Sequence, residues 1–224
     1  MPRITALQRV VQHVQTLGDP SAWEVADIQH DLSLALIDAV WSIGVRAGGV
    51  ANVLARYQAL RDDADGTPAD LAAWIERIGG PEAFADAVKN RQRTSTTNGI
   101  LKAEAVHREA TLLAGAGVTD VSGLTDAVRE LWITVPGQKS GTSWDALLIA
   151  TGHDTVKADR MLRRFVAAAT RTTEAKVSAA RAHELVVAAA AELGVSARAL
   201  DYAIWSYESA APARRTRATA SGSS

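Results

Sequence analysis

The segment that most restricts the fold of this chain is Val135–Val166, with the sequence VPGQKSGTSWDALLIATGHDTVKADRMLRRFV. It begins with the Pro136-Gly137 turn between two apolar runs of helical spacing. An apolar helix then runs to Gly152, and Asp159 heads an arginine-rich helix. Because proline presets φ and glycine allows positive φ, the backbone can turn tightly and point its N–H groups outward. The segment predicts two helices joined by a turn that can hold a phosphate, followed by a third helix.

Apolar residues recur at helical spacing along the rest of the chain, and no sustained alternation indicates a sheet. Low aromatic content (5%) and only six prolines favour helices. The sequence therefore predicts an all-α protein. Residues 1–32 are expected to form one or two short helices, broken at Gly18–Ser21. Further helices are expected over Leu34–Tyr57 with an interruption within Ser42–Gly49, and over Ala69–Ile78, Pro81–Val88, Ile100–Ala114, Leu124–Thr134, Thr142–Thr151, Asp159–Thr170, Lys176–Leu193 and Ala197–Glu208.

The composition excludes several classes of site. The chain has no cysteine, so it cannot form disulfides, cysteine-ligated zinc sites or iron–sulfur clusters. Its five histidines show no metal-ligand spacing, and we expect neither a metal nor another cofactor. The N-terminus lacks a signal-peptide pattern, and no apolar stretch reaches the roughly 20 residues that span a bilayer. We expect a cytoplasmic protein without a membrane partner.

The charges are unevenly distributed, although the formal net charge is −1. The stretch between Arg61 and Glu82 is acidic, whereas Lys139–Arg181 contains eight basic and four acidic residues. This distribution predicts one basic face, which a nucleic-acid backbone would favour. For any single arginine, an ordinary solvated position is an equally good interpretation.

Val135–Val166 resembles the helix-hairpin-helix and aspartate signature of the DNA glycosylases related to endonuclease III. In that family an LPGVG-type hairpin contacts the DNA backbone, and a catalytic aspartate follows one helix and one short loop later. Here Asp159 lies 23 residues after Pro136, as in the family, and Gly152 takes the place of its mid-segment glycine. Three further segments resemble the family in the same order, so the resemblance covers roughly residues 30–208: Leu36–Tyr57, Ile100–Leu113 and Ala182–Glu208.

The resemblance implies a two-lobed fold with a DNA-facing cleft between the lobes. Residues 33–152 would form a helical barrel lobe that carries the hairpin. Residues 1–32 and 153–210 would form the second lobe, and the small, polar, basic tail 211–224 is expected to be disordered. Both the hairpin and Asp159 would then lie at the mouth of the cleft.

The activity implied is that of a monofunctional DNA glycosylase, which hydrolyses the N-glycosidic bond of a damaged or modified base. A carboxylate near the sugar can stabilise oxocarbenium character and orient the attacking water, and Asp159 is the candidate for this role. A simple helix N-cap is the alternative for this residue, and one carboxylate can serve both purposes. Bifunctional members have a catalytic lysine where this chain has Gly141, so strand cleavage is not expected.

The hairpin residues Gly137, Lys139 and Gly141 are the candidates for binding backbone phosphate. Lys139 stands where the family has a second hairpin glycine, and a left-handed conformation there would cost roughly 1 kcal/mol. Its ammonium could offset this cost by contacting the phosphate directly.

Further candidates come from the helices around the hairpin. Arg160, Arg163 and Arg164 would contact the DNA strand or anchor their helix. Arg46 lies near the position of the family's intercalating glutamine, although a solvated arginine at a helix end is the commoner situation there. Trp41 and Trp144 would line a base pocket by stacking, or else pack in the core, as we expect for Trp132.

The expected partner is double-stranded DNA, bound by a monomer, with a nucleoid association if the protein is bacterial. Two other functions fit the sequence. The chain could be a non-catalytic DNA-binding protein that kept this scaffold, since the catalytic lysine and the intercalating glutamine are absent. It could also be a helical interaction module without nucleic-acid function, because fold alone does not fix function.

Overall fold

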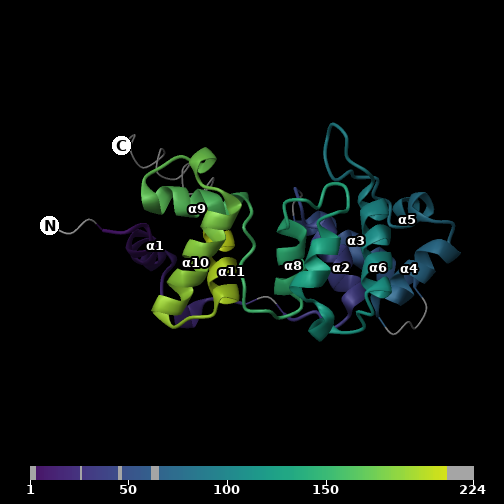
Figure 1. Cartoon of the computed structure of the whole chain (residues 1–224), viewed down its shortest axis with the longest axis horizontal. Helices are drawn as coiled ribbons and strands as arrows, with labels where there is room; N and C mark the ends of the chain where they lie inside the picture. Colours follow the sequence, from purple (N-terminus) through teal and green to yellow (C-terminus); the bar gives the residue numbers. More distant parts are fainter. Residues whose placement is uncertain (1–3, 26, 45–46, 62–65, 211–224) are drawn as a thin grey trace, which may run out of the picture. The chain divides into compact units, whose positions relative to one another are not determined.

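The computed structural model describes residues 4–25, 27–44, 47–61 and 66–210. Within this part of the chain the structure consists of eleven α-helices and four short 3-10 helices, and its only β-type pairing is one bridge between Arg93 and Leu101 (Figure 1). The predicted all-α class is confirmed. A membrane-spanning helix is not found among the described residues, because no helix there combines the length and the hydrophobicity that a span needs.

The chain forms two compact units. Among the described residues, unit 1 comprises 4–25 and 153–210, and unit 2 lies within 27–152. The predicted boundaries follow residues 32 and 152. The helices of unit 1 are α1 (Ala6–Val14), η1 (Gln15–Leu17), η2 (Pro20–Ala22), α9 (Arg160–Thr170), η4 (Glu174–Lys176), α10 (Ala179–Leu193) and α11 (Ala197–Ser209). Those of unit 2 are α2 (Leu32–Trp41), α3 (Ala47–Leu60), α4 (Pro68–Arg77), α5 (Pro81–Ala87), α6 (Lys102–Gly115), η3 (Val121–Gly123), α7 (Asp126–Trp132) and α8 (Thr142–Ala150).

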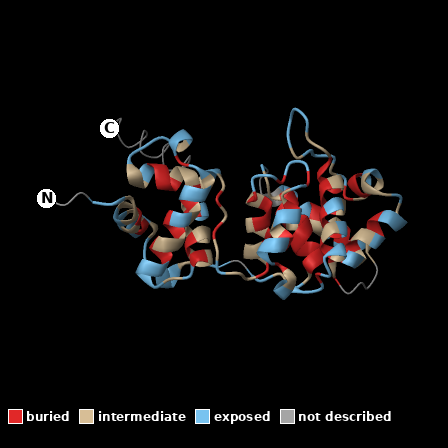
Figure 2. Ribbon diagram, in the orientation of Figure 1, coloured by how far each residue is buried: buried red, intermediate tan, exposed pale blue. Residues whose placement is uncertain are grey.

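Helix α2 is the central helix of unit 2. All but one of its ten residues are buried, and it packs against α3, α4, α6 and α8 (Figure 2). A helix that is apolar on every side has to be surrounded by other helices, which explains its central place. The predicted interruption after it is observed, since α2 ends at Trp41 and α3 begins at Ala47.

An aromatic cluster fills the core of unit 2 beside α2. Phe84 lies edge-on to Trp41 (5.7 Å between ring centroids), Trp74 (5.6 Å) and Tyr57 (6.2 Å), and Tyr57 and Trp74 also pack edge to face at 5.1 Å. Edge-to-face pairs contribute about 0.5–1.5 kcal/mol each beyond their burial. The cluster therefore ties α2, α3, α4 and α5 together.

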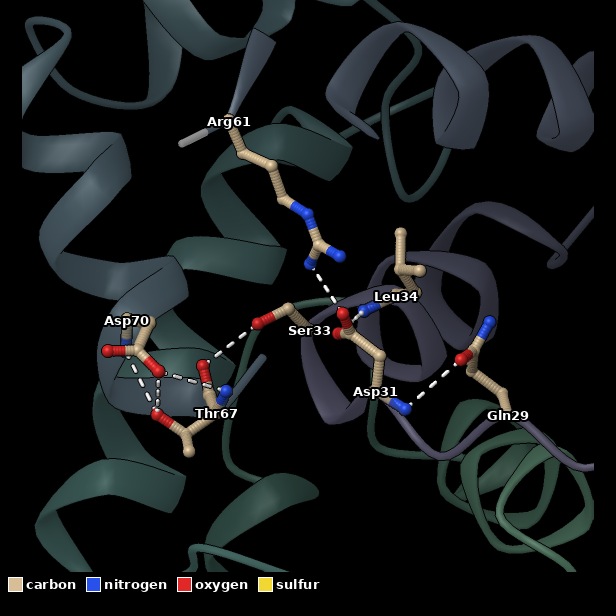
Figure 3. A network of polar contacts seen from close by, with 7 residues as sticks. All are labelled: Gln29, Asp31, Ser33, Leu34, Arg61, Thr67 and Asp70. Atoms are coloured by element: carbon tan, nitrogen blue, oxygen red, sulfur yellow. Dashed lines mark hydrogen bonds and ion pairs between the residues drawn. The ribbon is translucent and has the colours of Figure 1, made fainter. Parts of the chain in front are cut away.

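A polar network joins the beginnings of α2 and α4 (Figure 3). The Asp31 carboxylate caps α2 by accepting the Leu34 N–H at 2.9 Å, and it pairs with the Arg61 guanidinium at 2.5 Å. Ser33 Oγ donates to the carbonyl oxygen of Thr67 at 2.9 Å, and Thr67 forms a capping box with Asp70 at the start of α4. These contacts satisfy helix-terminal groups that would otherwise be buried without partners.

Unit 1 is a bundle of α1, α9, α10 and α11. Helix α1 packs against α9 and α10, and α11 packs against the same two helices. Its core is made mainly of aliphatic residues and Phe165. Side-chain caps begin the helices, with Asp159 at α9, Ser178 at α10 and Ser196 at α11. These caps stand where local sequence signals predict helix starts.

Candidate nucleic-acid interface

The turn between α7 and α8 is a tight helical hairpin. The N–H of Gln138 donates to the carbonyl oxygen of Val135, and the N–H of Gly141 donates to that of Gln138, both at 2.9 Å. Gly137 and Gly141 have φ of +91° and +73°, values that favour glycine. The two helices are therefore joined by consecutive turns whose direction depends on these glycines.

A buried chain of polar side chains holds the inner side of the hairpin. The indole Nε1 of Trp132 donates to Ser143 Oγ at 2.9 Å, and Ser143 Oγ donates in turn to the side-chain oxygen of Gln138. All three residues are buried. Because Trp132 belongs to α7, Gln138 to the turn and Ser143 to α8, the chain fixes the turn relative to both helices.

The outer side of the hairpin is open to solvent. Pro136, Gly137, Lys139 and Ser140 are all exposed. Among the described residues, the backbone N–H groups of Gly137, Lys139 and Ser140 have no hydrogen-bond acceptor. Such outward N–H groups in a turn form a concavity that can bind an anion.

Lys139 does not carry the backbone strain expected from the sequence. Within the described chain the only non-glycine residues with positive φ are Lys89 and Arg171. The expected left-handed conformation at Lys139 is therefore wrong, because the hairpin places its positive φ values at Gly137 and Gly141 instead. The exposed Lys139 ammonium adds positive charge beside the free N–H groups.

The loop between α5 and α6 supports the hairpin from the same end of unit 2 (Figure 1). A Cβ atom at Gly137 would lie 2.3 Å from the Cβ of Thr94, so the loop leaves space only for glycine. The loop is itself held by the bond from the Thr94 N–H to the carbonyl oxygen of Ile100 (2.9 Å) and by Arg93, which donates to the carbonyl oxygen of Gly99 (2.8 Å).

Gly141, the position of the lysine in bifunctional glycosylases, is covered by Arg129. A Cβ atom at Gly141 would lie 3.0 Å from the Arg129 guanidinium. Gly141 is itself buried at the start of α8, whereas Gly137 is exposed. Of the two hairpin glycines, only Gly137 therefore presents its backbone to solvent.

Asp159 is the N-cap of α9. Its Oδ1 accepts the N–H groups of Met161 (2.7 Å) and Leu162 (3.2 Å), and its Oδ2 lies 3.7 Å from the Lys157 ammonium. The side chain is 26% exposed. The N-cap interpretation is therefore correct, and the second carboxylate oxygen has no hydrogen bond to any described residue.

The three arginines after Asp159 differ in their surroundings. Arg160 is exposed. Arg163 donates to the carbonyl oxygens of Val177 (2.8 Å) and Glu174 (3.1 Å), and so anchors α9 to the segment before α10. Arg164 pairs with the buried Glu208 carboxylate at 2.5 Å and also donates to the Glu208 carbonyl oxygen at 2.9 Å. Of the two expected roles, anchoring the helix is the one observed for Arg163 and Arg164. Arg46 lies outside the described residues.

The predicted base-stacking role of two tryptophans is wrong. Trp41 is 0% and Trp144 2% exposed. The Trp41 ring packs on Phe84, and the Trp144 ring packs edge-on against Trp132 at 5.6 Å. Both side chains face the core of unit 2 because α2 and α8 turn their apolar faces toward one another, so neither ring can stack on a base in this structure. The expected core position of Trp132 is correct.

Two buried ionisable residues of α6 were not singled out from the sequence. Lys102 donates to the carbonyl oxygens of Trp41 (3.0 Å) and Ile43 (2.7 Å), which closes the end of α2, and burial lowers its pKa to about 8. Glu109 is fully buried and lacks a hydrogen-bond partner among the described residues, and burial raises its pKa to about 9. The two residues lie seven positions apart, so they share the buried and otherwise apolar face of α6. Charged residues at two positions of an apolar helix face were the sequence signal for their burial.

A family model described as Domain of unknown function (DUF8548) matches residues 8–209 of the chain. No curated protein and no solved structure matches it. The matched residues include both the α7–α8 hairpin and Asp159.

Proposed function

The chain belongs to this family of domains of unknown function, and we propose that it is a DNA-binding protein of the glycosylase type whose α7–α8 hairpin binds the phosphate backbone of duplex DNA. One observation carries the proposal. The exposed turn presents N–H groups of Gly137, Lys139 and Ser140 that have no acceptor among the described residues, together with the Lys139 ammonium. Proteins bind phosphate oxygens with backbone N–H donors and positively charged side chains of this kind.

The rigidity of the hairpin also supports the proposal. Backbone donors bind an anion well when their directions are fixed before binding, because no ordering entropy is then lost. The buried Trp132–Ser143–Gln138 chain fixes the turn from inside, and the contact between Thr94 and Gly137 fixes it from the neighbouring loop. Both constraints fix the directions of the outward N–H groups of the turn.

The binding proposal is tested by the salt dependence of affinity for a labelled DNA duplex. We expect the affinity to fall steeply between about 50 mM and about 200 mM salt. Lys139→Gln should weaken binding to all sequences and lower the slope of log K against log salt by about 1. Lys176→Gln, which removes an exposed lysine of η4 in unit 1, is the matched control and should leave the slope unchanged.

Two outcomes would contradict the binding proposal. One is the absence of salt-sensitive affinity, which would favour a helical interaction module without nucleic-acid function. The other is an equal effect of Lys139→Gln and Lys176→Gln, because the binding would then follow overall charge rather than the hairpin.

Hydrolysis of an N-glycosidic bond at Asp159 is the second part of the proposal. The Oδ1 atom is held by two backbone N–H groups, Oδ2 lies 3.7 Å from the Lys157 ammonium, and the side chain is 26% exposed. A carboxylate oriented in this way can face a sugar that develops positive charge, or position the attacking water. Because Gly141 replaces the lysine nucleophile, we propose hydrolysis without strand cleavage.

Asp159→Asn tests the catalytic role without loss of the helix cap, because asparagine caps helices about as well as aspartate. The assay is abasic-site formation on duplexes with alkylated, deaminated, oxidised or mispaired bases. We expect at least about a hundredfold loss of base release with DNA binding retained. Asp154→Asn is the matched control, since Asp154 also accepts hydrogen bonds at the start of a helix, from Ser196 Oγ (2.7 Å) and the Arg198 N–H (3.0 Å) of α11.

The results separate the catalytic from the binding proposal. Salt-sensitive DNA binding without base release from any duplex would favour the non-catalytic alternative. Base release that survives Asp159→Asn would assign the chemistry to another residue.

A further inference from the structure

Unit 1 contains a cavity that the proposed DNA-binding function does not use. It has a volume of about 320 Å³ and lies between α1 and the end of α9. Its lining residues are Ile4, Arg9, Gln12, His13, Thr16, Ala168, Ala169 and Arg171. None of these is acidic, and two are arginines. The volume lies at the lower end of the range for small-molecule sites.

The polar lining comes from one face of α1 and the residues that continue it. Arg9, Gln12, His13 and Thr16 follow one another at intervals of three, one and three residues, so they share one side of the helix. Val10 and Val14 lie in the core of unit 1 instead. Helix α1 thus presents an apolar face to the bundle and a basic, hydrogen-bonding face to the cavity.

The two arginines of the cavity have no acidic partner within the described chain. Two other arginines of unit 1 do, since Arg164 pairs with Glu208 and Arg181 with Glu184. Arg9 is half-buried, so water surrounds its side chain only in part. Two guanidinium groups without counter-charges at one cavity favour an anionic ligand.

The backbone at Arg171 gives an independent indication. Arg171 ends α9 in the left-handed conformation, with φ of 56° and ψ of 45°. Glycine is the usual residue there, and α10 ends with Gly194 in the same conformation. Arg171 therefore places a cation at the cavity at a cost of roughly 1 kcal/mol in backbone strain that glycine would not carry.

His13 and Gln12 add neutral donors to the two charges. The His13 ring packs on Phe165 at 4.6 Å, and burial lowers its pKa while Glu208 acts in the opposite direction. A neutral imidazole keeps one N–H donor, and the Gln12 amide supplies two more. Thr16 is not counted as a donor, because its hydroxyl already donates to the His13 carbonyl oxygen at 2.8 Å.

We propose that this cavity binds a phosphate group carried by a small organic molecule. The planar Arg9 and Arg171 guanidinium groups hold the phosphate oxygens, with His13 and Gln12 as further donors. Ile4, Ala168 and Ala169 form an apolar wall for the organic part. A phosphate monoester satisfies both halves of this lining, whereas inorganic phosphate satisfies only the charged half.

Calorimetric titration of the full chain with phenyl phosphate, in phosphate-free buffer, tests the proposal. Arg171→Gly should lower the affinity at least about tenfold. Its melting temperature should be equal to or higher than that of the parent, because glycine suits the left-handed position. Arg9→Gln should weaken binding similarly. Arg181→Gln, which removes an exposed arginine of α10, is the charge-matched control and should leave the affinity unchanged.

A second titration with inorganic phosphate distinguishes the two sources of the anion. Binding at least about tenfold weaker than that of phenyl phosphate supports the proposal, because the apolar wall then contributes. Equal affinity for both ligands would overturn the assignment to an organic phosphate. An affinity for phenyl phosphate that survives both Arg171→Gly and Arg9→Gln, or that falls equally in Arg181→Gln, would overturn the site itself.

Discussion

Glu109 gives the prediction with the most direct physical basis, because its carboxyl is buried in α6 without a hydrogen-bond partner in the described chain. Burial raises its pKa from 4.5 to about 9. In the unfolded chain the group ionises near its ordinary pKa, whereas in the native protein it keeps its proton. As the pH rises above 4.5, ionisation favours the unfolded state, so this group's contribution to stability is lost progressively until about pH 9.

The size of the effect follows from the pKa difference. Within this window each pH unit lowers the free energy of unfolding by about 1.4 kcal/mol, or about 3 kcal/mol between about pH 5 and about pH 7. Glu109→Gln removes the titrating group with almost no change of shape. We therefore expect the variant to be more stable than the parent at about pH 7, with the difference shrinking by about 3 kcal/mol at about pH 5.

Urea unfolding at the two pH values, followed by tryptophan fluorescence, measures this difference. Four of the six tryptophans, Trp41, Trp74, Trp132 and Trp144, are buried in unit 2, so the signal reports mainly on the unit that contains Glu109. Glu104→Gln is the matched control on the same helix, since Glu104 pairs with Arg108 near the surface. Other titrating groups cancel in the comparison. A stability difference that is the same at both pH values would refute the reasoning.

Two further predictions concern the hairpin and are measured by the same urea unfolding. Gly137→Ala places a Cβ atom 2.3 Å from the Cβ of Thr94 at a φ of +91° and should destabilise unit 2 by about 2 kcal/mol or more. Gly115→Ala is the control, because Gly115 is a helical glycine with open space around it. This substitution should leave the free energy of unfolding unchanged or raise it by up to about 1 kcal/mol. Similar losses of stability in both variants would contradict the steric argument. Ser143→Ala leaves the Trp132 N–H and the Gln138 side-chain oxygen buried without their partner, at a cost of about 2 kcal/mol. A loss below about 0.5 kcal/mol would show that the buried chain does not hold the turn.

The sequence by itself determined the local structure of this protein. From residue 69 onward, each predicted helix begins and ends within three residues of the observed one. The α7–α8 turn follows Pro136-Gly137, and Asp159 begins α9 as its cap. Helical periodicity, turn residues and caps act over a few neighbouring positions, so they can be recognised without knowledge of the packing.

Only the tertiary structure decided what the side chains of these helices contact. Trp41 packs on Phe84 rather than facing a base, and Arg164 binds Glu208 across 44 residues of sequence, which selects the anchoring role of the two predicted for it. The burial of Glu109 likewise depends on contacts between separate helices, and so does the position of Arg9 and Arg171 at one cavity. Periodicity shows which residues share a face, but the partner of that face is set by the packing of distant segments. That packing places Arg164 beside the Glu208 carboxylate and Arg171 beside an open cavity.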